Sequence, residues 1–183
     1  NNSETHKYIG AVSFHSWRGC DDVTLKKWAD AAKAINVPLL VGEGSTDAAA
    51  HGYAEIFNES TFALYEINLY TRICAICQPL SILQWQLTSD YSLLWGDGIY
   101  GSKGPLRPTQ RFWNIKQLAS TPADALAIPV SSSKKNVNCA AFGNMVRGEY
   151  AVHMVNNGAD CEAVISGIPA EVKELKVYVT NTK

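Results

Sequence analysis

The chain has 183 residues, of which 46% are hydrophobic and 18% charged, and its formal net charge is -1 at pH 7. This composition excludes a disordered or fibrous chain, and no run of Lys or Arg suggests binding to nucleic acid or to anionic lipid. No apolar window approaches the ~20 residues needed to cross a bilayer. The sequence begins at Asn1 without a Met or an apolar leader, so we expect either a removed leader or a start inside a longer protein.

Five cysteines stand at positions 20, 74, 77, 139 and 161, an odd number without paired CxxC elements. Cys74 and Cys77 lie in an apolar helical pattern, and no nearby histidine or second cysteine pair completes a metal site. We expect both to be small buried hydrophobic residues, and Cys139 and Cys161 to be free thiols. No metal or other cofactor is predicted.

Strand patterns alternate with helical patterns over residues 8–120. A first strand is predicted at residues 9–14, and the sequence HSWR, which contains His15 and Trp17, follows it directly. Asp21 or Asp22 then offers an N-cap for a helix whose apolar residues recur at helical spacing. A second strand follows, and it ends in the sequence GEG around Glu43.

A further helix, strand and helix complete this half of the chain. Ser60 can cap a helix that reaches Cys77. A third strand is predicted from residue 81 to about residue 87, with Trp85 near its end, and a Gly-rich loop that includes Tyr91 follows it. Pro108 suits the first turn of the last helix.

Strands that alternate with helices in this way indicate right-handed crossovers and a parallel sheet. Functional side chains in such sheets gather where the strands end and the loops begin. With regular alternation, Val41 and Leu39 point inward if Glu43 does. If His15 points inward, so do Trp17 and Ser13, while Phe14 and Val12 face the helices. If Trp85 points inward, the neighbouring glutamine amides need partners in the helix layer.

Residues 125–183 have a different pattern. Short strand patterns at residues 137–142, 150–155, 163–166 and 175–179 are separated by Asn-, Gly- and Asp-containing turns. We therefore predict two domains, residues 1–124 with an α/β fold and residues 125–183 with an antiparallel β fold. The helix over residues 108–120 is expected to pack against the second domain through Phe112 or Trp113.

The order of these motifs resembles the last part of a clan A glycoside hydrolase. The apolar run "PLLVGEG" ends in Glu43, the strand "SILQWQ" with Trp85 follows one βα unit later, and the helix "RFWNIKQLA" leads into the β strands. The chain is most similar to glycoside hydrolase family 30. This resemblance implies an α/β plus all-β fold, namely the last three βα units of a (β/α)8 TIM barrel followed by an incomplete β-sandwich module.

The resemblance also implies a retaining O-glycoside hydrolase that acts on a β-linked oligo- or polysaccharide. Glu43 matches the nucleophile, Trp85 the platform under the reacting sugar, and His15 with Trp17 the end of the sixth barrel strand; Tyr91 would line a sugar subsite. Glycines beside Glu43 would leave room for the sugar. The family's pattern places the acid/base Glu before this chain. Glu59 follows Asn58 in an Asn-Glu pair of this chain, but it precedes a helix and is not expected to be that acid.

Three further consequences follow from the resemblance. The rest of the barrel would come from missing sequence or another chain, so this fragment alone would be inactive. The intact enzyme would be secreted or periplasmic. Nucleic acid and membranes are not expected as partners.

Two other interpretations remain open at the level of sequence. The chain could be a carbohydrate-binding relative that retains Trp85 without catalysis. It could also be a structural α/β domain, which an ion pair between a solvent-shielded Glu43 and Lys or Arg would favour. GxSxG, GxGxxG and P-loop motifs are absent, so a nucleophile-elbow hydrolase or a nucleotide enzyme has no support.

Overall fold

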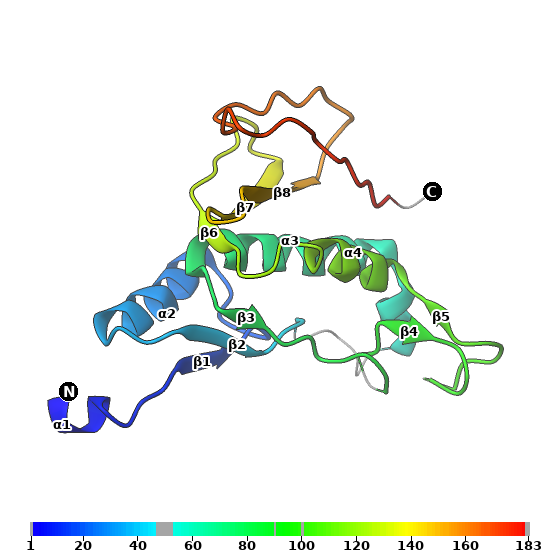
Figure 1. Ribbon diagram of the computed structural model, residues 1–183. Helices are drawn as coiled ribbons and strands as arrows, with labels where there is room; N and C mark the ends of the chain where they lie inside the picture. Colours follow the sequence, from blue (N-terminus) through cyan, green and yellow to red (C-terminus); the bar gives the residue numbers. More distant parts are fainter. Residues whose placement is uncertain (1, 47–52, 90, 100, 182–183) are drawn as a thin grey trace.

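The computed structural model describes residues 2–46, 53–89, 91–99 and 101–181 (Figure 1). Its elements follow in this order: α1 (Ser3–His6), β1 (Val12–His15), α2 (Asp22–Ala34), β2 (Leu39–Glu43), the 3-10 helix η2 (Ala54–Asn58), α3 (Ser60–Cys77), β3 (Ser81–Ile82), β4 (Leu94–Trp95), β5 (Arg107–Pro108), α4 (Gln110–Leu118), β6 (Leu126–Ile128), β7 (Val137–Asn144) and β8 (Glu149–Asn156).

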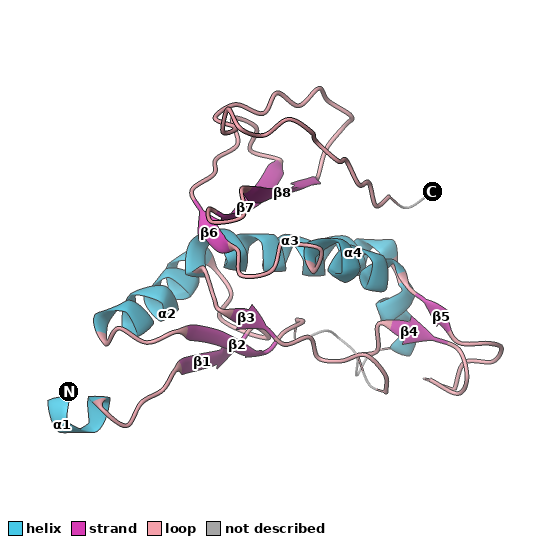
Figure 2. Cartoon of the chain, viewed as in Figure 1, coloured by secondary structure: helices cyan, strands magenta, loops and turns pink. Residues whose placement is uncertain are grey.

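The molecule has a layer of helices between two small sheets (Figures 1 and 2). On one side lies the parallel sheet with strand order β1-β2-β3, and on the other the antiparallel sheet β6-β7-β8. Helix α3 packs against α2, α4 and β7, so it lies at the centre of the layers. A separate antiparallel pair, β4-β5, follows the loop after β3.

The core between the parallel sheet and its helices contains Phe14, Leu39 and Val41 together with apolar residues of α2 and α3. Phe14 stacks on Trp28 of α2, with ring centroids 5.4 Å apart. The expectation that Phe14 faces the helices is confirmed. The expectation that Leu39 and Val41 share a face with Glu43 is wrong, because both belong to this helix-facing core and are buried.

A β-bulge explains that difference. Phe14 pairs with Val41, but the next residue, His15, pairs with Glu43, so Gly42 is an extra residue in β2. One inserted residue reverses the alternation of side chains after it. Glu43 therefore lies on the side of His15, although Val41 two residues earlier points to the helices.

Element boundaries differ from the predicted ones where local interactions override the sequence pattern. Asp21 is the N-cap of α2, as expected, and accepts a hydrogen bond from the backbone N–H of Thr24 at 3.0 Å. The N-cap of α4 is Thr109, and Pro108 lies before it in β5. β3 is shorter than predicted, although the Leu83 backbone N–H still donates to the Val41 carbonyl at 3.0 Å.

The antiparallel sheet confirms the predicted strands at residues 137–142 and 150–155, which form β7 and β8. Residues 163–166 and 175–179 form no strand, so those two predictions are wrong. Their apolar side chains lie on the surface: Val164 is 86% exposed and Val177 82%. A strand pattern alone forms no ladder without a neighbouring strand to hydrogen-bond with.

The β module rests mainly on α3 rather than on α4. Asn68 of α3 bonds to the side chains of Asn138 and Asn157, and α3 packs against all three strands of the module. Helix α4 contributes a smaller contact, in which Gln117 donates to the carbonyl of Tyr178 at 2.9 Å. The predicted role of α4 is thus only partly right.

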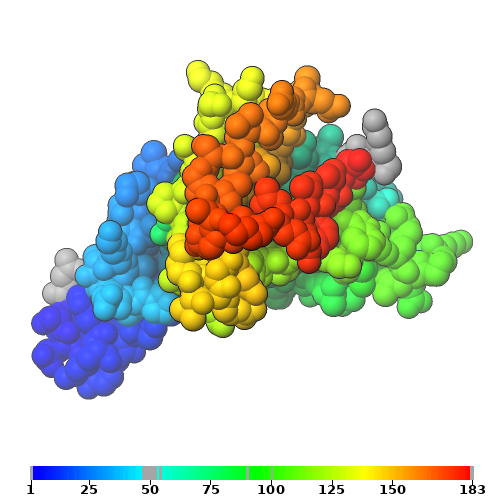
Figure 3. Space-filling view, turned by 45° about the horizontal axis from the view of Figure 1, so that its top comes forward, coloured from blue at the N-terminus to red at the C-terminus, as the bar shows by residue number. Residues whose placement is uncertain are grey.

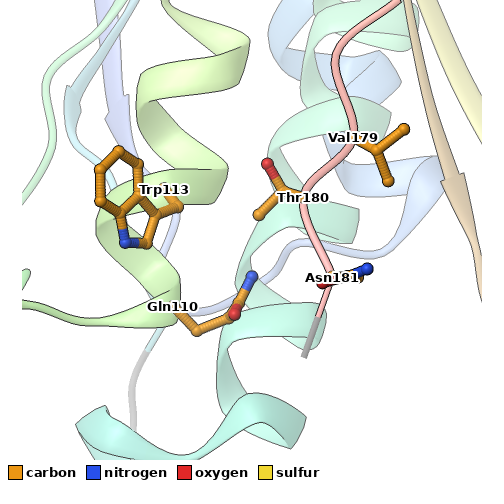
Figure 4. Close-up of a pocket in the computed structure, with 5 residues that line it drawn as sticks. All are labelled: Gln110, Trp113, Val179, Thr180 and Asn181. Atoms are coloured by element: carbon orange, nitrogen blue, oxygen red, sulfur yellow. The ribbon is translucent and has the colours of Figure 1, made fainter. Parts of the chain in front are cut away.

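The chain after β8 runs over the surface of the module and ends beside α4 (Figure 3). There, Gln110 and Trp113 of α4 line a small pocket together with Val179, Thr180 and Asn181 (Figure 4). Trp113 therefore does lie at the contact between α4 and the C-terminal segment, as predicted, while its ring also packs edge-on against Phe112.

Candidate active site

The ends of the three parallel strands meet at one edge of the sheet, because parallel strands share one direction. His15 is the last residue of β1 and Glu43 the last of β2, and they are direct neighbours in the ladder. The His15 Nδ1 atom lies 3.4 Å from Glu43 Oε2. The side chain of Glu43 is 25% exposed and that of His15 54%, so the pair is open to solvent at the strand ends.

Three aromatic rings line the same edge, with Trp17 at their centre. Its ring lies 5.4 Å from the ring of His15, 6.5 Å from that of Trp85 and 6.2 Å from that of Tyr91, between centroids. The ring planes of Trp17 and Tyr91 are within 7° of parallel. The structure therefore brings together all five predicted site residues: His15, Trp17, Glu43, Trp85 and Tyr91.

The position of Trp17 is fixed by the backbone after Glu43. Its indole Nε1–H donates to the carbonyl of Gly44 at 3.3 Å, which ties the loop after β1 to the end of β2. Trp85 is 37% exposed and lies where β3 has left the ladder. An exposed aromatic face beside a carboxylate suits the apolar C–H face of a sugar ring, which stacks on aromatic planes while its hydroxyls remain hydrogen-bonded.

The glycines beside Glu43 have a different function from the one expected. A Cβ atom on Gly42 would lie 2.6 Å from Ser13 Oγ, and one on Gly44 would lie 2.4 Å from Tyr70 Oη. Protein atoms fill the space on both sides, so it is not open to a sugar. The glycines allow β1 and α3 to approach β2 closely, which any larger residue would prevent.

Sequence reasoning missed two buried charged residues beneath this edge. Glu66 of α3 and Arg111 of α4 form a two-pronged ion pair, with Arg111 Nη2 2.8 Å from Glu66 Oε1 and Arg111 Nε 2.9 Å from Oε2. Their side chains are 1% and 0% exposed. Two signals were available: a single acid within the apolar pattern of residues 60–77, and an arginine next to Phe112 and Trp113 in the first turn of α4.

Gln84 and Tyr70 join this pair. The amide of Gln84 donates to Glu66 Oε1 at 3.4 Å and accepts from the phenol of Tyr70, so the predicted need for a helix-side partner at Gln84 is confirmed. Burial, followed by the negative charge of Glu66, raises the pKa of Tyr70 well above its ordinary value of 10.0. Tyr70 is consequently a neutral hydrogen-bond donor.

Other potential site chemistry is limited. Glu59 is exposed before α3 and accepts a hydrogen bond from Thr61 at 3.3 Å, in keeping with the expectation that it lies outside any strand end. Within the described residues, no group of three or more His, Cys, Asp or Glu side chains is arranged to hold a metal ion. No helix in the described ranges is both long and apolar enough to span a membrane.

Pockets elsewhere on the molecule do not include the five site residues. The pocket of Figure 4 lies between α4 and the C-terminal segment. A larger, mostly apolar groove runs beside β3 and is lined by Leu80, Ile82, Ile115, Leu118 and Phe142, among others. The candidate site is an open edge, whereas the groove lies between β3, α4 and β7.

Comparison with solved structures identifies the fold. A GH30 endoxylanase from Clostridium papyrosolvens C71 matches this chain with a TM-score of 0.64 at 11% sequence identity, over 86% of this chain and 36% of the endoxylanase. No family model and no curated protein matches the sequence. The chain therefore has a mixed helix-and-sheet fold like that of part of a GH30 enzyme, and it spans about a third of the length of that enzyme.

Proposed function

We propose that this chain is the nucleophile-bearing part of a retaining O-glycoside hydrolase that acts on a β-linked glycan, with Glu43 as the nucleophile. The observation that carries the proposal is the strand-end group of Glu43, His15 and the three aromatic rings, on a fold like that of a GH30 endoxylanase. Glu43 is partly exposed, and within the described residues it lies in ion-pair distance of His15 rather than of Lys or Arg. This pattern favours a reactive carboxylate over a structural one.

The chemistry needs a second carboxylate. Retaining hydrolysis uses two carboxyl groups about 5–5.5 Å apart, one that forms a glycosyl-enzyme and one that acts first as acid and then as base. In this proposal Glu43 attacks the anomeric carbon as the second carboxyl group protonates the leaving oxygen. That group comes from strands outside these 183 residues, which extend the sheet β1-β2-β3 into a barrel and are supplied by further sequence or by another chain.

The surrounding residues have distinct roles in this proposal. Trp85 provides the platform for the reacting sugar, and Trp17 with Tyr91 extends the stacking surface to a neighbouring sugar unit. His15 donates a hydrogen bond from its ring to the Glu43 carboxylate or to a sugar hydroxyl. Since the substrate is an oligo- or polysaccharide, the intact enzyme is secreted or periplasmic, and β-1,4-xylan is the first glycan to test.

The test is the Glu43→Gln variant of the intact enzyme, assayed on xylan and on a panel of other β-linked glycans. Turnover should fall by at least about 1,000-fold with sugar affinity retained, because the amide keeps the shape of the side chain but cannot form the covalent intermediate. The matched control is Glu59→Gln, which makes the same change at an exposed glutamate. Near-normal rates in Glu43→Gln would reject the proposal.

A second candidate function is a carbohydrate-binding relative without catalysis. The aromatic rings of Trp17, Trp85 and Tyr91 favour it as much as they favour hydrolysis, because stacking alone binds sugars. A wild-type protein that binds a β-linked glycan and releases no reducing ends from it would support this alternative.

A further inference from the structure

A chain of buried hydrogen bonds connects the three loops that carry the candidate site. The Ser16 hydroxyl donates to the carbonyl of Ser45 at 2.5 Å, and the Ser45 hydroxyl donates to Glu66 Oε1 at 2.8 Å. Glu66 is paired with Arg111, whose Nη1 donates to the carbonyls of Tyr91 at 3.0 Å and Ser92 at 2.8 Å. The path thus runs from the loop after β1, through the loop after β2, to the loop after β3.

The path meets the backbone close to three residues of the site. Ser16 stands between His15 and Trp17, and Ser45 stands two residues after Glu43. Arg111 holds the backbone of Tyr91 itself. The chain of bonds therefore restrains the backbone beside Trp17, Glu43 and Tyr91, without its own side chains taking part in the strand-end group.

The backbone at Ser45 needs this support. Its φ angle is +87°, in the left-handed region that non-glycine residues seldom adopt. Two buried hydrogen bonds hold that conformation, one donated by the Ser45 hydroxyl and one accepted by the Ser45 carbonyl. The turn they stabilise is the one that follows Glu43 directly.

Stability alone does not account for the central ion pair. Glu66 and Arg111 are almost fully buried, and a buried ion pair contributes little net stability compared with apolar packing of similar volume. Such a pair does, however, specify one arrangement, because any displacement leaves a buried charge without its partner. The rings of Phe57 and Phe62 lie 5.0 and 5.2 Å from the guanidinium and further restrict it.

We propose that Ser16, Ser45, Glu66 and Arg111 are positioning residues, which hold the backbone of Glu43, Trp17 and Tyr91 in the geometry that glycoside cleavage requires. This inference rests on the proposed function, since it assigns residues that act through Glu43. They touch neither substrate nor reacting atoms. Their effect belongs to the turnover step, where a displacement of about 1 Å can cost about 100-fold in rate.

The test compares Ser16→Ala, Ser45→Ala and Arg111→Lys in the intact enzyme, with 2,4-dinitrophenyl β-xylobioside as the probe substrate. Each serine change removes one hydroxyl, and the lysine keeps a positive charge but cannot reach both Glu66 and the Tyr91 carbonyl as a planar fork. The matched control is Arg147→Met, which removes the exposed ion pair between Arg147 and Glu149 in the β module, away from the site.

At a temperature well below every melting transition, the serine variants should lose about 10- to 100-fold in kcat with KM within about 3-fold, and Arg147→Met should match the wild type. In the double variant of Ser45→Ala and Arg111→Lys, the loss of kcat should be smaller than the product of the two single losses, because both changes break the same path. Wild-type kcat in both serine variants would overturn the positioning role, even if melting temperatures fall.

The same assays separate this inference from the proposed function. Normal turnover in Glu43→Gln would reject Glu43 as nucleophile. Loss of turnover in Glu43→Gln combined with wild-type kcat in Ser16→Ala and Ser45→Ala would reject only the positioning role. If Arg111→Lys does not fold, the two serine variants decide the question.

Discussion

Two carboxylates only 23 positions apart in the chain have opposite environments, and the contrast is informative about function. Glu43 lies at the open strand ends, a quarter exposed, with the half-exposed His15 as its ion-pair contact. Glu66 lies beneath the same edge, 1% exposed, and receives hydrogen bonds from Arg111, Ser45 and Gln84. The solvent-shielded pair with arginine that marks a structural acid belongs to Glu66, whereas Glu43, the nucleophile that we propose, has no such environment.

The first and largest expected effect concerns the buried pair. Arg111→Met should lower the free energy of unfolding by about 3–5 kcal/mol, because it leaves the Glu66 charge buried without its partner. Glu43→Gln should change it by less than about 1 kcal/mol, since that side chain is partly exposed. Urea unfolding of the intact enzyme at pH 7 measures both. Similar losses of unfolding free energy in Arg111→Met and Glu43→Gln would contradict the contrast between the buried and the exposed carboxylate.

The second expected effect concerns the aromatic rings beside Glu43. Trp85→Ala should weaken binding of xylohexaose by about 1–3 kcal/mol, the range for the loss of a large buried apolar surface, and should reduce turnover as well. Calorimetric titration measures the affinity. The control is Trp113→Ala, which removes an equally large ring that is 44% exposed on α4. Equal losses of xylohexaose affinity in Trp85→Ala and Trp113→Ala would reject Trp85 as the platform for the sugar.

A third prediction uses pH to test the buried region. Because the pKa of Tyr70 is raised in the folded state, its phenol contributes stability that is fully present below pH 10 and is lost as pH rises above 10, where the unfolded chain ionises. Tyr70→Phe should remove that part of the alkaline loss of stability. The measurement is the melting temperature between pH 8 and pH 11. An unchanged pH profile in Tyr70→Phe would contradict this interpretation.

The smallest expected effect concerns the thiols on the same helix as Glu66. Burial raises the pKa of Cys74 to about 12 and that of Cys77 to about 11, whereas Cys161 is exposed. At pH 8 a disulfide reagent such as Ellman's should modify Cys161 rapidly and the two helix thiols only on unfolding. Rapid modification of Cys74 would show that the α3 core opens readily.

The alternation of strands and helices could be predicted from sequence, because apolar periodicity and the Asp21 cap are local signals. The gathering of the five candidate residues at one sheet edge could be predicted because parallel strand ends meet there. The bulge at Gly42 could not, since it depends on how two strands pair, and it changed which face Leu39 and Val41 occupy. The Glu66–Arg111 pair joins residues 45 positions apart, and no local pattern links them.

The predicted strands at residues 163–166 and 175–179 failed for a related reason. Their composition suits a strand, but strands form only with a hydrogen-bonding neighbour, and these apolar side chains remain exposed. The groove beside β3 is likewise lined by apolar residues at a sheet edge. Both features fit a chain that matches only about a third of a larger GH30 enzyme.

The most direct test of the central claim is to trap the covalent intermediate. The intact enzyme is incubated with 2,4-dinitrophenyl 2-deoxy-2-fluoro-β-xylobioside, which forms a glycosyl-enzyme that hydrolyses slowly, and the labelled peptide is sequenced by mass spectrometry. The account predicts one fluoro-xylobiosyl group per enzyme, attached to Glu43. A label on another carboxylate, or no label on an enzyme that hydrolyses the parent xylobioside, would contradict it.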